Sequence, residues 1–176
     1  YGMDVSNWEW LDNASNKEKS VYFAEKYMLP YLNTVAYSGY KPMDQVINLE
    51  GYEGDYAKIN TSSGVSFVLN NGALVYLLVG FVNNTEGESG KNYNRVTIVY
   101  DIDGAKGFNL YGKDIFRVEL GGLDGWHSQS MISRNRFLPY HYDSSKKCEE
   151  YLSSSFVGQH GCNGVTKYAC LAYLMC

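Results

Sequence analysis

One glycine-rich stretch of the sequence gathers four side chains whose oxygens could bind a metal ion. Calcium takes about six to eight oxygen ligands from carboxylates, amides and backbone carbonyls, and glycines let those carbonyls turn inward. The stretch therefore contains a candidate calcium site. Its candidate ligands are Asp101, Asp103, Asn109 and Asp114.

The same stretch also has a purely structural interpretation. It departs from the EF-hand pattern, because Gly104 comes too early and Gly112 stands where the bidentate glutamate belongs. Aspartate side chains commonly cap their own turns, and glycine supplies the positive φ angles that tight turns need. A calcium site and a turn without metal both remain open at this point.

Cysteine offers a second kind of chemistry. All four cysteines lie near the end of the chain, and an even number in one short segment is typical of disulfides formed in an oxidising compartment. No Cys-x-x-Cys pair occurs, so the spacing favours disulfides over a zinc site. The residues are Cys148, Cys162, Cys170 and Cys176.

Geometry argues against one of the three possible disulfide pairings. Residues 168–175 are predicted to form a strand, on which Cys170 and Cys176 would lie about 20 Å apart. A disulfide needs Cα atoms within about 7 Å of each other. We therefore do not expect Cys170 to pair with Cys176, or Cys148 with Cys162, and two pairings remain.

The usual catalytic side chains are not arranged for a recognisable reaction. The histidines lack the partners of a zinc protease, and neither a Gly-x-Ser-x-Gly motif nor a phosphate-binding glycine loop occurs. An isolated loop histidine is usually solvated. We therefore expect no enzyme activity. The histidines are His127, His141 and His160.

The aromatic residues are compatible with a carbohydrate-binding function. Exposed aromatic rings can stack on sugars, but Tyr and Trp also pack within sheets, which we favour here. The chain has 17 tyrosines and three tryptophans, Trp8, Trp10 and Trp126.

Composition narrows the fold and the partners. The formal net charge of −4 argues against binding to nucleic acid or an anionic membrane surface, since both reward dense Lys and Arg. The longest apolar run, Ala73 to Val82, is too short to cross a bilayer. With 176 residues, of which 45% are hydrophobic, we expect one globular domain over residues 1–176.

One helix is expected near the start of the chain. Ser15 and Glu18 form a capping-box pattern, and Pro30 should end or kink the helix that follows. Apolar residues recur every three or four positions, which predicts an amphipathic helix with one core-facing stripe. The stripe consists of Val21, Ala24, Met28, Tyr31 and Val35.

Strands follow the helix along the chain. Asn71-Gly72 is a strong hairpin signal between two apolar runs, and Phe116, Val118 and Leu120 should form the dry face of a later strand. Because helix and strands are segregated, we expect an α+β fold with the amphipathic helix packed on an antiparallel sheet. The predicted strands are residues 63–69, 73–82, 95–100, 114–120 and 168–175.

The connection from Asp101 to Phe116 resembles a segment of type IV pilin-like and type II secretion pseudopilin-like globular domains. That segment reads Asp-x-Asn-Gly-x-x-Gly-Pro-Asn, and Gly-Lys/Arg-Asp-x-Phe follows; here Asp103 replaces the asparagine and Phe108 the proline. The hairpin at residues 68–72 and the disulfide loop at residues 162–172 resemble the same family. The matching residues are Asp101, Gly104, Gly107, Asn109, Gly112, Lys113, Asp114 and Phe116.

This resemblance implies a non-catalytic structural subunit of a type IV pilus or pseudopilus-like filament on the bacterial cell surface. Such subunits polymerise with other pilin-like subunits through an apolar amino-terminal helix, which is not among these 176 residues and would be the only part in a membrane. The family also implies a Cys162–Cys170 disulfide, which leaves Cys148 with Cys176 and closes the carboxy-terminal region. Some pseudopilins bind calcium in a related loop. The alternative is a secreted adhesive or carbohydrate-binding module that calcium could stabilise.

Overall fold

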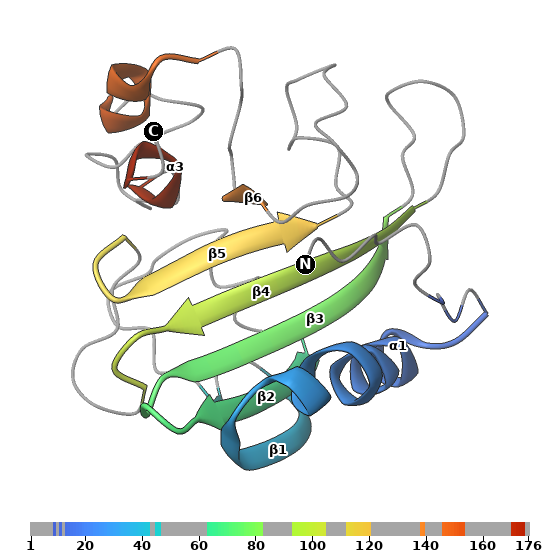
Figure 1. Cartoon of the computed structure of the whole chain (residues 1–176). Coiled ribbons are helices and arrows are strands. Elements are labelled where there is room, and N and C mark those ends of the chain that lie inside the picture. Colours follow the sequence, from blue (N-terminus) through green and yellow to red (C-terminus); the bar gives the residue numbers. More distant parts are fainter. Residues whose placement is uncertain are drawn as a thin grey trace.

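The computed structural model shows one helical segment near the start of the chain, a sheet, and two short helices near its end (Figure 1). The residues that it describes are 9, 11, 13–42, 45–46, 63–82, 93–104, 112–120, 138–139, 146–153 and 170–174. Among these residues, no helix has both the length and the apolar character that a membrane crossing requires.

Helix α1, Asn16–Phe23, begins at the capping box that the sequence predicts. The amide and the hydroxyl of Ser15 each donate to Glu18 Oε2 over 2.8 Å. The Glu18 amide donates to Ser15 Oγ over 3.3 Å. These reciprocal bonds satisfy backbone donors that the first turn of a helix otherwise leaves unpaired.

The regular α-helix ends at Phe23, and the rest of the helical segment is irregular around Pro30, where the sequence predicts an end or a kink. A π-helical turn η2, Ala24–Met28, and a 3₁₀ turn η3, Leu29–Tyr31, follow α1. The helix cannot continue regularly through Pro30, because proline lacks a backbone N–H. Tyr31 and Val35, which we expected on the apolar stripe, are instead 75% and 67% exposed.

Within the described residues, the strands form one six-stranded sheet (Figure 1) in which every neighbouring pair is antiparallel and the spatial order equals the order along the chain. This meander confirms the α+β class and the four strands predicted between residues 63 and 120. The strands are β1 Thr34–Pro42, β2 Ser63–Leu69, β3 Leu74–Val82, β4 Tyr93–Asp101, β5 Ile115–Leu120 and β6 Leu138–Pro139.

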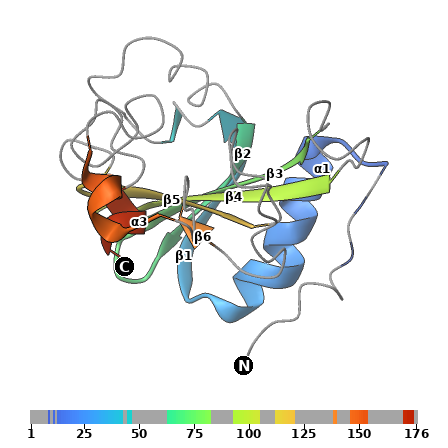
Figure 2. The ribbon, with the colours of Figure 1, turned by 90° about the horizontal axis from the view of Figure 1, so that it is seen from above.

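The main core lies between α1 and one face of the sheet. Figure 2 shows α1 on a single side of the strands, and its contacts are with β1, β2 and β3. Phe23 and Ala24 supply the buried helix residues of this core. The strand residues buried against them are Val65, Phe67, Val75, Leu77, Val79 and Val96.

Ser20 joins α1 to the sheet through a hydrogen bond. The pairing of β3 with β2 ends at Leu77, whereas β3 continues to Val82 beside β4. The Val79 amide, which lies beyond the paired stretch of β2 and β3, donates to Ser20 Oγ over 2.9 Å. A buried serine hydroxyl thus takes the place of the missing strand partner.

Strand β1 was not expected from the sequence, because its first residues continue the helical apolar stripe. Its register with β2 shifts between Thr34 and Ala36, and again between Tyr37 and Gly39. Gly39 has a φ angle of +67°, a conformation that glycine adopts at bulges. β1 is one of the two outermost strands that the structure describes.

The expected dry face of β5 is less buried than the opposite face of the same strand. Ile115 and Arg117 are buried, whereas Phe116 and Val118 are only partly buried. Arg117 can be buried because its guanidinium forms an ion pair with Glu119 over 2.5 Å, and a paired charge is less costly to bury than an isolated one. An alternating pattern predicts that a strand has two different faces but does not determine which face is buried. In β5 the face that carries Arg117 and Glu119 is the more buried one.

The carboxy-terminal end forms a helix, so the strand predicted for residues 168–175 is wrong. Helix α3, Cys170–Leu174, packs against the 3₁₀ helix η5, Cys148–Leu152. Tyr151 and Cys170 are almost fully buried. Alanine and leucine in this run favour helix, and a short apolar run cannot be assigned from periodicity alone.

Candidate functional site

Asp101 occupies the end of β4 and is completely buried. Its backbone pairs with Leu74 of β3 on one side and with Ile115 of β5 on the other, and none of its surface is exposed. Oδ1 accepts a hydrogen bond from the Gly104 amide over 3.0 Å. Oδ2 meets no hydrogen-bond donor among the described residues. Within the described residues, a backbone amide thus satisfies one of the two carboxyl oxygens.

The Asp103 carboxyl lies beside that of Asp101. Burial is the main reason that the pKa of Asp101 is raised to about 7, and the side-chain hydrogen bond with Asp103 is the second. Two carboxyl groups can share a hydrogen bond only when one of them carries a proton. The raised pKa of Asp101 means that this carboxyl keeps its proton to a higher pH than an ordinary aspartate does, unless a cation replaces the proton.

Two glycines shape the turn around this pair. Gly104 and Gly112 have φ angles of +64° and +79°, which agrees with the turn interpretation of the sequence. A Cβ atom on Gly104 would lie 2.3 Å from the carbonyl oxygen of Gly72. The turn after β4 thus packs directly on the Asn-Gly turn between β2 and β3, and only glycine fits at the contact.

The structure brings together some of the candidate calcium ligands. Asp101 and Asp103 are neighbours, and the carbonyl oxygen of Asp114 accepts a hydrogen bond from the Ile102 amide over 2.9 Å. Asn109 lies outside the described residues. Within the described part of the chain, no cluster of three or more His, Cys, Asp or Glu residues could hold a metal ion. Calcium binding stays a prediction that would draw on backbone oxygens or on Asn109.

The cysteines differ in their bonding. Cys170 is disulfide-bonded and buried, whereas Cys148 is a free cysteine of intermediate exposure. The expected Cys148–Cys176 bridge is therefore not formed. The argument against a Cys170–Cys176 bridge also fails, since it assumed an extended strand and a helix rises only about 1.5 Å per residue.

The remaining candidates from the sequence cannot be placed. Three histidines and three tryptophans lie outside the described residues, so neither a catalytic nor a sugar-stacking arrangement of these side chains is tested. They are His127, His141, His160, Trp8, Trp10 and Trp126.

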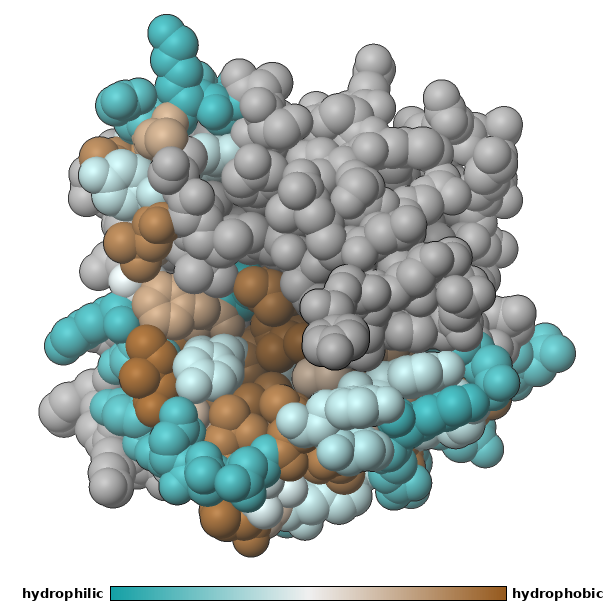
Figure 3. All heavy atoms as spheres, in the orientation of Figure 1, coloured by the Kyte–Doolittle hydropathy of each residue, from teal (hydrophilic) through white to brown (hydrophobic). Residues whose placement is uncertain are grey.

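An apolar surface lies beside the helix, and the sequence predicts only its part on β5, Phe116 and Val118. Phe116 and Val118 pair with Tyr100 and Ile98, so all four side chains lie on the sheet face that carries α1. Figure 3 shows apolar side chains gathered between α1 and the strand ends near the turns. We call this surface the apolar flank; its half-buried residues are Leu32, Leu69, Ile98, Tyr100, Phe116 and Val118.

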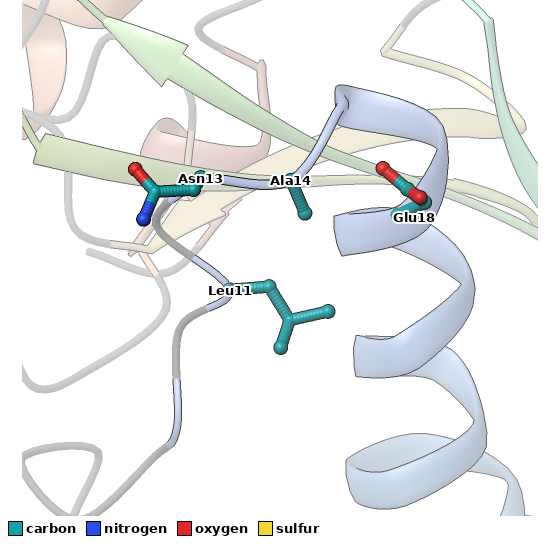
Figure 4. A pocket seen from close by; sticks show the side chains of 4 residues that line it. All are labelled: Leu11, Asn13, Ala14 and Glu18. Atoms are coloured by element: carbon teal, nitrogen blue, oxygen red, sulfur yellow. The ribbon is translucent and has the colours of Figure 1, made fainter.

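A shallow, open hollow lies at the start of α1 and is lined by Leu11, Asn13, Ala14 and Glu18 (Figure 4). The Glu18 carboxylate already accepts two bonds from Ser15, and these bonds are the main reason that the pKa of Glu18 is lowered. A carboxylate that is engaged in a helix cap and has a low pKa is a poor general base. Glu18 is therefore not suited to act as a general base in this hollow.

Comparison with known proteins adds no family assignment: no family model, curated protein or solved structure matches this chain.

Proposed function

We propose that this chain is a structural subunit of a type IV pilus or pseudopilus-like filament on the bacterial surface. The observation that carries the proposal is the corner at Asp101–Gly104. Gly104 there packs on the turn at Gly72, in the segment whose sequence resembles pilin-like domains. The packing of α1 on an antiparallel meander is compatible with such a domain.

The start of α1 restricts how a filament helix could be attached. Ser15 caps α1, and the Ala14 amide donates to the Leu11 carbonyl over 2.9 Å, which makes a turn immediately before the cap. A helix that continued from an earlier segment would have neither feature. In this proposal the apolar filament helix is therefore a separate helix that precedes Glu9, and α1 follows it.

The apolar flank is the proposed contact surface between neighbouring subunits. Half-buried apolar side chains that gather on one sheet face are candidates for a protein interface. A closed disulfide loop, Cys162–Cys170, is part of the same proposal and agrees with the bonded state of Cys170. The proposal also includes the absence of catalysis and an extracellular location, where disulfides are stable.

Filament assembly can be tested with a matched pair of substitutions. Val118→Thr places a hydroxyl on the apolar flank with little change of shape, while Val35→Thr makes the same change on exposed β1. We expect immunogold label for this protein along surface filaments, and several-fold less label for Val118→Thr only. Melting temperatures exclude unfolding as the cause. The proposal fails if the gene encodes no apolar helix before Tyr1, or if no filament is labelled.

A secreted carbohydrate-binding module is the second candidate, and two exposed rings favour it. Tyr31 and Tyr37 are 75% and 40% exposed, and exposed tyrosine rings can stack on sugars. In this alternative, Tyr31→Ala and Tyr37→Ala abolish binding on a glycan array, whereas Val35→Ala leaves it unchanged. The absence of binding to any glycan by the wild-type chain would exclude the alternative.

A further inference from the structure

Glu9 is held against α1 by several polar contacts that converge on this one residue. Its carboxylate accepts bonds from Lys26 Nζ and from the Tyr22 hydroxyl, each over 2.5 Å. Its backbone amide donates to the Tyr27 hydroxyl over 2.8 Å. Side chain and main chain of Glu9 are thus both bound to the same helical segment.

The helix side of this contact is pre-arranged. Lys26 Nζ donates to the Tyr22 hydroxyl over 2.6 Å and lies 5.0 Å and 5.5 Å from the ring centres of Tyr22 and Tyr27. The Tyr27 ring in turn packs on Phe23 of the core, with 5.3 Å between ring centres. The groups that receive Glu9 are therefore positioned by packing as well as by Glu9 itself.

The residues between Glu9 and the helix cap show the direction of the chain. Leu11 and Asn13 line the hollow beside Glu18, in the first turn of α1 (Figure 4). Glu9 reaches Tyr22, Lys26 and Tyr27, more than one turn further along the helical segment. Traced backward from Ser15, the chain thus runs beside α1 toward the end of that segment.

We propose that Glu9, Leu11, Asn13 and Ala14 form a strap, and that Glu9 is the latch that fixes its path along α1. The latch determines the direction from which any polypeptide before Glu9 meets the domain. It is also releasable, because the Glu9 and Lys26 side chains are 69% and 40% exposed, and exposed ion pairs are weak and screened by salt.

The latch would also affect filament structure, and this consequence rests on the proposed function. If an apolar helix precedes the strap, a closed latch holds that helix and α1 at a defined angle, and an open latch lets the angle vary. The strap itself needs no filament. Its test therefore uses the isolated 176-residue chain, and its failure and that of the filament proposal are separate outcomes.

Amide hydrogen exchange at Glu9, followed by NMR, tests the strap directly. We expect the wild-type Glu9 amide to exchange about tenfold more slowly than in an unstructured peptide, because it is hydrogen-bonded. Tyr27→Phe keeps the ring that packs on Phe23 but removes the acceptor oxygen, and it should return exchange to within about twofold of the unstructured rate.

Lys26→Met provides a second variant that does not alter the core. It should accelerate Glu9 exchange several-fold, and about 1 M salt should do the same in the wild type, since the Debye length then falls to about 3 Å. Lys17→Met is the matched control, because Lys17 is an exposed lysine of α1 outside the latch. The strap is refuted if wild-type Glu9 exchanges at the unstructured rate, or if Lys17→Met accelerates exchange as much as Lys26→Met.

Discussion

At the scale of single residues, the most unusual group is the Asp101 carboxyl. Its pKa in the folded protein is raised to about 7 from an ordinary value of 3.8, mainly by burial. The folded state therefore binds this proton more tightly than the unfolded chain does. The resulting contribution to stability is complete below about pH 4 and is lost as the pH rises through about 7.

Asp101→Asn should remove this pH dependence. Other carboxyl groups with lowered pKa values, such as Glu9 and Glu18, act in the opposite direction at low pH, so the informative quantity is the difference between wild type and variant. We expect urea unfolding to show the wild type losing stability relative to Asp101→Asn between pH 4.5 and pH 8. Parallel stability curves would show that Asp101 is not protonated in the fold.

The contact between two turns gives a second prediction at this scale. Gly104→Ala places a methyl group against the Gly72 carbonyl, 2.3 Å away, in a residue with positive φ. We expect a loss of roughly 3 kcal/mol, from backbone strain and overpacking together. Gly72→Ala is the control, because its φ is also positive but the space around it is open, and it should cost about 1 kcal/mol. Equal losses would contradict the close packing of the turns.

At the scale of elements, Ser20 connects α1 to the sheet. Ser20→Ala leaves the Val79 amide, which lies beyond the paired stretch of β2 and β3, without its acceptor. A buried donor without a partner costs about 1–3 kcal/mol, so thermal unfolding should show a clear loss of stability. Ser38→Ala on exposed β1 should be nearly neutral. The role assigned to Ser20 would be wrong if the two variants unfolded alike.

The elements that the sequence predicts well are those with strong local signals. The capping box of Ser15 and Glu18 and the Asn71-Gly72 turn each depend on a few adjacent residues, and both are present in the structure. β1 and α3 were not predicted, because their form depends on partners far away in sequence. The spacing of Val35 fits a helical stripe, yet Val35 lies in strand β1 because this segment pairs with β2.

In the candidate site, too, local features can be predicted from the sequence, whereas features that depend on distant residues cannot. Its glycines and acidic residues are visible in the sequence, but the burial of Asp101 between β3 and β5 is a tertiary property. The Glu9 latch also escapes sequence analysis, since it joins residues separated by 13 to 18 positions. Exposed polar residues at such separations carry no periodic signal.

At the scale of the whole molecule, bound calcium would increase the thermal stability of the fold. If the ion binds at the Asp101 turn, millimolar Ca²⁺ raises the melting temperature, EDTA reverses the effect, and Asp101→Asn abolishes it. Because the ion competes with the proton that Asp101 holds, the effect should be larger at pH 8 than at pH 5. A melting temperature that changes with neither Ca²⁺ nor EDTA would exclude the calcium site.

The carboxy-terminal cysteines give a further prediction for the whole chain. Alkylation of the native protein should modify Cys148 and spare Cys170, which is buried and bonded. Peptide mapping without reduction should then link Cys170 to Cys162 or to Cys176. Reduction should lower stability by about 2–4 kcal/mol. A peptide in which Cys148 is already cross-linked would contradict the arrangement described here.

The two outer strands of the described sheet limit how copies of this molecule can meet. β1 is interrupted by two register shifts and ends in Lys41 and Pro42, while β6 contains only Leu138 and Pro139. Irregular, short or proline-bearing borders are poor templates for another chain to extend the hydrogen-bonded ladder. At high concentration the protein should therefore resist amyloid-like growth, and any ordered assembly of copies must rely on side chains rather than on shared backbone.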